Sequence, residues 1–336
     1  MSPIITKPRA LVARKVFPEV LERLAEAVEL ETNQDDGVFS PAELADRLKD
    51  KDGALLTLSE AVNKEVLAGA PRLKIVANIA VGYNNLDLAA LTAAGVMATD
   101  TPDVLTETTA DFGWALLMAA ARRVTESEHF LRAGKWNKWS LVDGFLGQDI
   151  YGATLGILGM GRIGQALARR AKGFGMRVIY HNRSRLAEDV EAECGAAYVG
   201  KEELLRSADH LVLVLPYSAA THHAIGAAEL AHMKPSAVLV NLARGGIVDE
   251  NALAAALREG RLFAAGIDVF EGEPKVNPAL TALSNVVLTP HIASASDATR
   301  RGMANLAADN LLAGLRLGRQ AGRPPSLLNP EVLGKQ

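Results

Sequence analysis

The sequence is poor in several features that define other classes of protein. Cys194 is the only cysteine among 336 residues, which excludes an internal disulfide and a cysteine-rich zinc site. No apolar run reaches the roughly 18 residues that a membrane span requires. The first ten residues lack the apolar stretch and small-residue cleavage site of a secretory signal. These absences suit a reducing compartment, and we expect a cytoplasmic protein.

An excess of one charge is also lacking. Lysine and arginine number 36 and aspartate and glutamate 39, which gives a formal net charge of −3. Such a balance supplies no broad basic surface, so neither nucleic acid nor membrane is expected as a partner. No HExxH or similar ligand spacing is present. His222 and His223 are adjacent, and neighbouring side chains point apart in a strand or helix, so we expect no metal.

The pattern that is present predicts two α/β domains. At about 150 residues per domain the length suggests two. Strand-like and helix-like segments alternate up to residue 100, and the alternation restarts at Thr154, which is typical of doubly wound parallel sheets. We expect strands at 10–14, 53–58, 73–79, 96–100, 154–158, 177–181, 211–215, 237–242, 263–269 and 286–289. We expect helices at 17–27, 85–95, 103–123, 162–174, 184–194, 250–259 and 299–317, with an irregular stretch at 134–151 and a loose, proline-rich tail.

A glycine-rich motif predicts a dinucleotide site. Gly159, Gly161 and Gly164 form a GxGxxG pattern that follows a predicted strand and opens a predicted helix. The glycines would allow a tight turn, close approach of the backbone to a pyrophosphate, and close packing of helix on strand. Arg162 and Ile163 lie between them, where free N–H groups at the helix start would hold phosphates. The motif alone is weak, because glycine-rich turns are common; its context favours cofactor binding.

The end of the next strand favours NADP(H) over NAD(H). An acidic residue about 20 residues after the motif would bind the ribose 2′-hydroxyl of NAD. Here Asn182, Arg183 and Ser184 occupy that place, and no acid occurs before Glu188. An arginine and a serine would bind a 2′-phosphate through charge-assisted hydrogen bonds. The alternative is that they form a solvated turn and that either cofactor is accepted, with NAD(H) the weaker one.

Three later segments carry an arginine, a carboxylate and a histidine at the ends of apolar strands. Arg244, the pair Glu271 and Glu273, and His291 would therefore lie at the ligand-binding edge of a sheet. Reduction of a 2-oxo acid needs a cation for the substrate, a proton donor for its carbonyl oxygen, and a partner for that donor. The alternatives are a structural ion-pair arginine, a capped loop histidine and surface glutamates.

With these motifs the sequence resembles D-isomer-specific 2-hydroxyacid dehydrogenases over about residues 10–320, most of all the glyoxylate/hydroxypyruvate reductase and 2-ketogluconate reductase branch. The segments 81–85, 101–107 and 221–223 support the resemblance beside the glycine motif. It implies that His291 is the acid/base, Glu273 its partner and Arg244 the substrate-orienting cation. It further implies cofactor contacts at Leu215, Pro216, Thr221, Ala243 and Asp268, and substrate contacts at Leu58, Val81, Gly82, Arg244 and His291.

The resemblance also implies a domain arrangement. Residues 1–102 and 293–336 would form a discontinuous, flavodoxin-like substrate domain, and residues 103–292 a Rossmann cofactor domain, with hinges near Pro102 and Ile292. The segment of about 123–151 would make a homodimer. Trp136 or Trp139 would then reach the partner's active site.

The function that follows is transfer of hydride from NADPH to a small 2-oxo acid, giving the D-2-hydroxy acid. Glyoxylate, hydroxypyruvate and 2-ketogluconate share the reacting centre, and the sequence does not choose among them. The alternative is a dinucleotide-binding regulatory protein of the same fold without metabolic turnover.

Overall fold

The structure is a computed structural model that describes residues 7–142 and 144–335. Two compact units make up the chain. The first combines Met1–Leu105 with Ser296–Gln336, and the second is Thr106–Ala295. Residues 1–6, 143 and 336 lie outside the described residues. Three predictions fall partly on them. The expected lack of a secretory signal concerns residues 1–6, the predicted substrate domain includes residues 1–6 and 336, and the predicted dimer segment includes residue 143.

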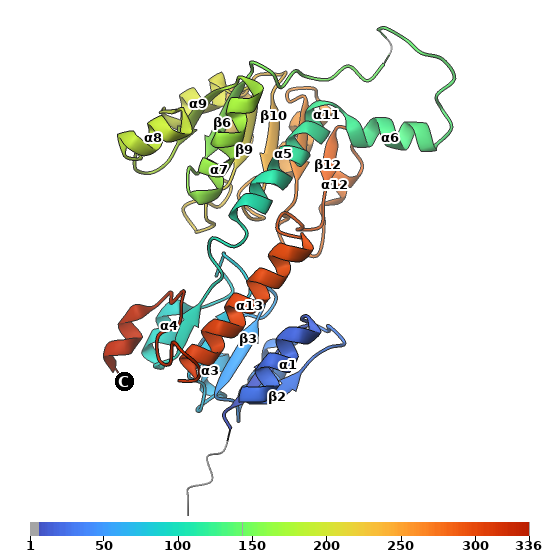
Figure 1. Cartoon of the computed structure of the whole chain (residues 1–336). Coiled ribbons are helices and arrows are strands. Elements are labelled where there is room, and N and C mark those ends of the chain that lie inside the picture. Colours follow the sequence, from blue (N-terminus) through green and yellow to red (C-terminus); the bar gives the residue numbers. More distant parts are fainter. Residues whose placement is uncertain (1–6, 143, 336) are drawn as a thin grey trace, which may run out of the picture. The chain divides into compact units, whose positions relative to one another are not determined.

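The first unit is built on a five-stranded parallel sheet of order β2-β1-β3-β4-β5 (Figure 1). This is the flavodoxin-like order. All four residues of β3 and of β4 are buried, as expected of strands covered on both faces. The elements are β1 (Arg9–Val12), α1 (Pro18–Ala27), β2 (Glu29–Thr32), α2 (Pro41–Leu48), β3 (Gly53–Leu56), α3 (Lys64–Ala68), β4 (Ile75–Asn78), α4 (Leu88–Ala93), β5 (Met97–Thr99), α13 (Asp297–Gly314) and the 3₁₀ helix η2 (Pro330–Lys335).

The long helix α13 returns from the end of the chain to cover this sheet. Its residues Ala304, Ala307, Ala308 and Leu311 are buried in a cluster with apolar residues of the sheet. A Cβ on Gly53 of β3 would lie 2.7 Å from Leu311 Cδ1. A side chain at Gly53 would press on Leu311, so glycine suits the close approach of the helix to the sheet.

The tail after α13 corrects one sequence-based expectation. The proline-rich segment is not loose, because Leu327 forms an antiparallel bridge with Thr99 of β5. Asn329 is buried, accepts a hydrogen bond from Ala98 N–H at 2.8 Å and donates one to Val96 O at 2.9 Å. Prolines prevent a helix or a central strand here, but they do not prevent an extended edge segment with side-chain hydrogen bonds.

The second unit is built on a seven-stranded parallel sheet of order β12-β11-β10-β9-β6-β7-β8. This is the Rossmann order extended by one strand, so the predicted fold class of two doubly wound parallel sheets is confirmed. The elements are α5 (Thr106–Ala121), α6 (Val124–Arg132), β6 (Thr154–Leu158), α7 (Arg162–Ala171), η1 (Lys172–Phe174), β7 (Arg177–His181), α8 (Glu188–Cys194), β8 (Ala196–Tyr198), α9 (Lys201–Ser207), β9 (His210–Leu213), α10 (Ala227–His232), β10 (Val238–Asn241), α11 (Glu250–Arg258), β11 (Ala264–Ile267), α12 (Pro278–Thr281) and β12 (Val286–Leu288).

The arm, residues 123–151, contains a helix that the periodicity did not reveal. The predicted helix over 103–123 ends as α5 at Ala121, and Arg123 adopts a left-handed φ of +53°. The chain then forms α6, which has no buried residue within this chain. In Figure 1 α6 and the segment after it project away from the sheet of the second unit.

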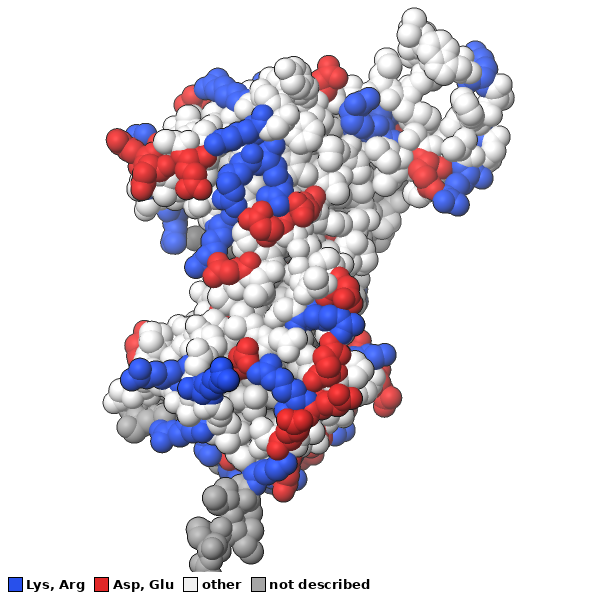
Figure 2. Space-filling model, viewed as in Figure 1, with Lys and Arg blue, Asp and Glu red and all other residues white. Residues whose placement is uncertain are grey.

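The surface of each unit carries both signs of charge. Figure 2 shows lysine and arginine side chains interspersed with aspartate and glutamate side chains on the visible face of each unit. Among residues 7–142 and 144–335, no helix combines the length and apolar character needed to cross a membrane.

Two glycines of α13 supply a matched test of its packing. A Cβ on Gly314 would lie 2.9 Å from Ile75 Cβ, whereas a Cβ on Gly302 would meet nothing within 4 Å. We expect Gly314→Ala to lower the free energy of unfolding by about 1–3 kcal/mol through overpacking. Gly302→Ala should raise it by about 1 kcal/mol, because alanine favours the helix. Urea denaturation measures both changes, and equal effects at the two sites would contradict this account.

Candidate active site

The loop after β10 presents Arg244 at the carboxyl edge of the second unit's sheet. The buried Asn241 side chain accepts a hydrogen bond from Ala243 N–H at 3.0 Å and donates one to Arg244 O at 3.1 Å, which fixes the turn. A Cβ on Gly245 would overlap the Phe270 carbonyl, so only glycine permits the turn to touch the next loop. Burial lowers the pKa of Arg244, and the nearby Glu273 carboxylate opposes that change.

Glu273 lies in the loop after β11 and His291 in the loop after β12, and their side chains are in contact. Glu273 Oε2 lies 2.8 Å from His291 Nδ1, and Oε1 accepts a hydrogen bond from Phe270 N–H at 2.9 Å. Burial raises the pKa of Glu273, but the His291 and Phe270 hydrogen bonds outweigh it and leave the pKa below its usual range. The residue types alone did not choose between Glu271 and Glu273, and the resemblance implied Glu273. The structure sets Glu273 against His291 and sets Glu271 against His223, at 3.1 Å.

Asp268 lies beneath this pair and holds the histidine segment. Its side chain is completely buried. Oδ1 accepts hydrogen bonds from Thr289 Oγ1 at 2.7 Å and Ile292 N–H at 2.9 Å, and Oδ2 accepts one from Ala293 N–H at 2.9 Å. Desolvation still raises the pKa of Asp268 above its usual value. This carboxylate, for which the resemblance implies a cofactor contact, positions the loop that carries His291.

The glycine motif forms a tight turn between β6 and α7. Gly159 has a φ of +104°, and a Cβ there would lie 2.7 Å from Leu215 N. A Cβ on Gly164 would lie 2.5 Å from Gly159 O, so the helix contacts the turn directly. At Gly161 a Cβ would meet nothing within 4 Å, and no side chain caps the helix there. An open backbone with uncapped N–H groups fits the phosphates of a dinucleotide.

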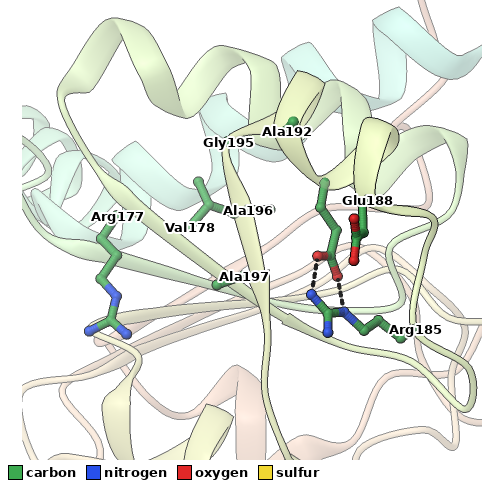
Figure 3. A pocket seen from close by; sticks show the side chains of 9 residues that line it. Arg177, Val178, Arg185, Glu188, Ala192, Gly195, Ala196 and Ala197 are labelled. Atoms are coloured by element: carbon green, nitrogen blue, oxygen red, sulfur yellow. Dashed lines mark hydrogen bonds and ion pairs between the residues drawn. The ribbon is translucent and has the colours of Figure 1, made fainter.

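The segment after β7 assigns different tasks to its polar residues. Asn182 Oδ1 accepts a hydrogen bond from Met160 N–H at 2.7 Å and so supports the glycine turn. Arg183 and Ser184 are exposed. Arg185 forms two hydrogen bonds with Glu191, of 2.9 and 2.7 Å, beside an open surface pocket (Figure 3). The hydrogen bonds from Arg185 and from the buried Tyr180 lower the pKa of Glu191 to about 2.

The remaining predicted cofactor residues flank the glycine turn or the Arg244 turn. Leu215 and Pro216 follow β9, and Leu215 contacts the glycine turn. Thr221 Oγ1 accepts a hydrogen bond from Ser218 N–H at 2.7 Å and donates to Pro216 O at 2.9 Å, which closes this loop. Ala243 is buried in the Arg244 turn, and Arg162 and Ile163 begin α7.

Leu58, Val81 and Gly82 belong to the first unit, whereas every other candidate belongs to the second. Their loops follow β3 and β4. Asn85 Nδ2 donates to Thr57 O at 3.0 Å, and Asn78 Nδ2 donates to Gly82 O at 3.2 Å, so an asparagine pair brings the two loops together. The positioning roles of Asn78, Asn85 and Asn241 were missed. An asparagine at the last position of an apolar strand is the signal that could have revealed Asn78 and Asn241, whereas Asn85 lies in the loop and carries no such signal.

One geometric expectation is wrong. The rings of His222 and His223 were expected to point apart, yet they stack with centroids 3.9 Å apart and planes 23° apart. His223 has a φ of +49°, so the pair lies in a turn and follows neither strand nor helix geometry.

The chain is similar to known proteins over almost its whole length. Residues 114–293 match the family model described as D-isomer specific 2-hydroxyacid dehydrogenase, NAD binding domain. The chain is 49% identical over 331 residues to a glyoxylate reductase of Thermococcus onnurineus, with 97% of each chain covered. It is 47% identical to a glyoxylate reductase of Pyrococcus horikoshii over 331 residues, again with 97% of each covered.

Solved structures show the same similarity. An NADPH-dependent glyoxylate/hydroxypyruvate reductase of Sinorhizobium meliloti, in complex with NADP and malonate, matches with a TM-score of 0.85 and 36% identity. The match covers 97% of this chain and 98% of that one. A protein of Thermus thermophilus matches with a TM-score of 0.87 and 43% identity, covering 95% of this chain and 99% of that one.

The lowered pKa of Glu273 predicts a pH-dependent contribution to stability. A carboxyl group whose pKa is lower in the folded state stabilises the fold above its unfolded value of about 4.3 and loses that effect as pH falls through the folded value. The Glu273→Gln variant has no ionisable side chain at this position. We expect the difference in unfolding free energy between wild type and variant to be largest near neutrality and to shrink below about pH 4.3. Urea titrations from pH 7 to 3 measure it, and a constant difference would contradict the assignment.

Proposed function

This chain belongs to the D-isomer-specific 2-hydroxyacid dehydrogenase family, and we propose that it uses NADPH to reduce glyoxylate and hydroxypyruvate to D-2-hydroxy acids. 2-Ketogluconate is a further candidate substrate. The observation that carries the proposal is the 2.8 Å contact between His291 and Glu273 beside the half-buried Arg244. These three groups supply the proton donor, its partner and the cation that reduction of a 2-oxo acid requires.

The mechanism assigns one task to each group. The Arg244 guanidinium binds the carboxylate and keto oxygen of the substrate and stabilises the negative charge that grows on that oxygen. When bound, NADPH supplies the hydride that adds to C2. His291 gives its proton to the keto oxygen through Nε2, since Nδ1 faces Glu273. The Glu273 carboxylate holds the imidazole in this orientation.

Three residues of the first unit are proposed as substrate contacts. We assign it the role of substrate domain and the second unit the role of cofactor domain. The backbone N–H groups of Val81 and Gly82 would bind the substrate carboxylate. Leu58 would contact the group attached to C2 and contribute to the choice among substrates.

The cofactor preference rests on the exposed residues after β7. Asn182 supports the glycine turn and Arg185 is paired with Glu191, which leaves Arg183 and Ser184 as the groups for a 2′-phosphate. Among the described residues Arg183 has no ion-pair partner, so its charge is available to a ligand. A carboxylate here would repel the phosphate, and none is present before Glu188.

The arm is proposed to form a homodimer. Large apolar side chains on it are strongly exposed, including Trp139 at 75%, Leu141 at 73% and Trp136 at 63%. Exposed apolar groups that cluster in this way mark a protein interface. Phe130 and Phe145 pack edge to face within the arm, so it has internal structure to offer a partner.

Cys194 is a free, buried thiol, which suits the cytoplasm as the proposed location.

An initial-rate panel tests the proposed activity. NADPH and NADH would each be combined with glyoxylate, hydroxypyruvate, 2-ketogluconate and pyruvate, and oxidation of the cofactor followed at 340 nm. We expect turnover of the first three acids with higher kcat/KM for NADPH than for NADH. Tight NADPH binding without turnover of any acid would instead favour a dinucleotide-binding regulatory protein.

Two charge-matched variants in the same panel separate the 2′-phosphate site from general electrostatics. Arg183→Ala should raise the KM for NADPH about ten- to a hundredfold, because it removes a charge-assisted hydrogen bond, and should leave the KM for NADH unchanged. Arg177→Ala removes an exposed positive charge from the opposite end of β7 and should change neither value. A wild-type preference for NADH would overturn the cofactor assignment.

Trp139→Ala tests the arm. If Trp139 lies in the interface, the variant should weaken dimerisation by at least about tenfold, since buried tryptophans dominate interface energies, and should raise the KM for the 2-oxo acid. Val38→Ala, which shortens an exposed apolar side chain of the first unit, should change neither. Sedimentation velocity over a concentration series gives the dimer constant. Unchanged sedimentation together with unchanged kinetics would remove Trp139 from the interface.

A further inference from the structure

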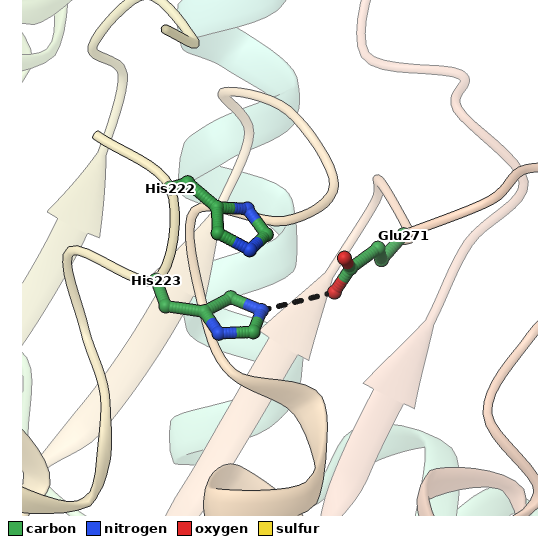
Figure 4. Close-up of side chains that lie close together, drawn as sticks. All are labelled: His222, His223 and Glu271. Carbon is green, nitrogen blue, oxygen red and sulfur yellow. Dashed lines mark hydrogen bonds and ion pairs between the residues drawn. The ribbon is translucent and has the colours of Figure 1, made fainter. Parts of the chain in front are cut away.

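Three potential metal ligands meet outside the proposed catalytic group. His222 and His223 lie in the loop between β9 and α10, and Glu271 lies in the loop after β11 (Figure 4). One ligand atom from each lies within 4.8 Å of the others. All three side chains are exposed, so an ion could enter directly from solvent. None of the three has a part in the proposed reaction.

The cluster is held in place by its surroundings. His223 N–H donates to Gly246 O at 2.7 Å, which fixes the histidine pair to the Arg244 turn. A Cβ on Gly246 would lie 3.3 Å from His222 Nδ1 and 3.7 Å from Glu271 Cδ, so the missing side chain leaves room for the cluster. Glu271 N–H donates to Glu250 Oε1 at 2.7 Å. The three side chains therefore start from fixed backbone positions.

One ring nitrogen of each histidine lies near the other ligands, and because the two rings stack, one ring must turn out of the stack when both bind the same ion. His222 Nδ1 lies 3.2 Å from the Tyr217 hydroxyl, which leaves Nε2 as the atom offered to an ion. A hydrogen bond of this kind to the second ring nitrogen is the usual way in which proteins orient a metal-ligating histidine. His223 Nε2 lies 3.1 Å from Glu271 Oε2. Two ligands of tetrahedral zinc are about 3.3 Å apart when each bond is about 2.0–2.1 Å, so these two atoms already have nearly the required separation.

We propose that His222, His223 and Glu271 form a binding site for a divalent transition-metal ion, with zinc as the preferred ion and water as the fourth ligand. Two imidazoles and one carboxylate are a ligand set that zinc accepts, and an open fourth position is compatible with an exposed site. The ion replaces the hydrogen bond between His223 and Glu271. It joins the loop that contains Thr221 to the loop that contains Glu273, and so it links two segments around the Arg244 turn.

Calorimetric titration of the tag-free, full-length protein with zinc chloride, after removal of metals with a chelator, tests the site. We expect one zinc ion per chain. Cobalt(II) titration gives an independent readout, because four-coordinate cobalt absorbs strongly in the visible region. A hundredfold excess of zinc over its dissociation constant should raise the thermal unfolding midpoint by about 5 °C. None of these readouts depends on turnover, so they stand apart from the proposed activity.

Four variants locate the ion. His222→Gln, His223→Asn and Glu271→Gln should each weaken zinc binding at least about tenfold; asparagine is chosen because it tolerates a positive φ. His129→Gln is the control, since His129 lies 3.9 Å from Glu128 on α6 and no third ligand joins them among the residues that the structure describes. It should bind zinc as wild type does. Circular dichroism without metal verifies folding of every variant. Absence of stoichiometric zinc binding, or an equal loss in the control, would overturn the proposal.

Discussion

A single buried carboxylate organises the edge of the sheet on which the proposed chemistry depends. The side chain of Asp268 accepts hydrogen bonds from a hydroxyl and two backbone N–H groups of the segment that carries His291. The main-chain carbonyl oxygen of Asp268 accepts a further hydrogen bond from His291 N–H at 2.8 Å. Burying this group without partners would be strongly unfavourable, so the carboxylate and its donors must be present together. His291 adopts a φ of +53°, a conformation that needs such support in a residue other than glycine.

The sequence was most informative where an apolar run is bounded by glycine. The predicted strands 154–158 and 177–181 agree with β6 and β7, because the interior of both runs is buried and each has a glycine within two residues of one end. Periodicity was weak in two segments. Helix α6 has no buried residue, and the tail is held in part by hydrogen bonds of the buried Asn329, which leave no hydrophobic pattern.

The residues of the candidate site also differ in how far the sequence could predict them. Residue types and strand ends were sufficient to bring forward Arg244, Glu273 and His291, but spacing alone could not choose between Glu271 and Glu273. That choice depends on the turn at Gly272, whose φ is +80°. The arginines after β7 were indistinguishable in sequence, and only the position of Glu191 separates Arg185 from Arg183. Pairings between side chains on different loops require tertiary structure.

The discontinuity of the first unit has a consequence for the order of events during synthesis. The ribosome delivers β1 to β5 first, but α13 covers their sheet and its buried residues Ala307 and Leu311 are made some 200 residues after β5. The second unit lies wholly between these two parts of the chain. It can therefore bury its own core while the nascent first unit still exposes the apolar face of its sheet. For this chain the amino-terminal unit is the last to mature, and a nascent polypeptide halted before α13 would present that face to chaperones.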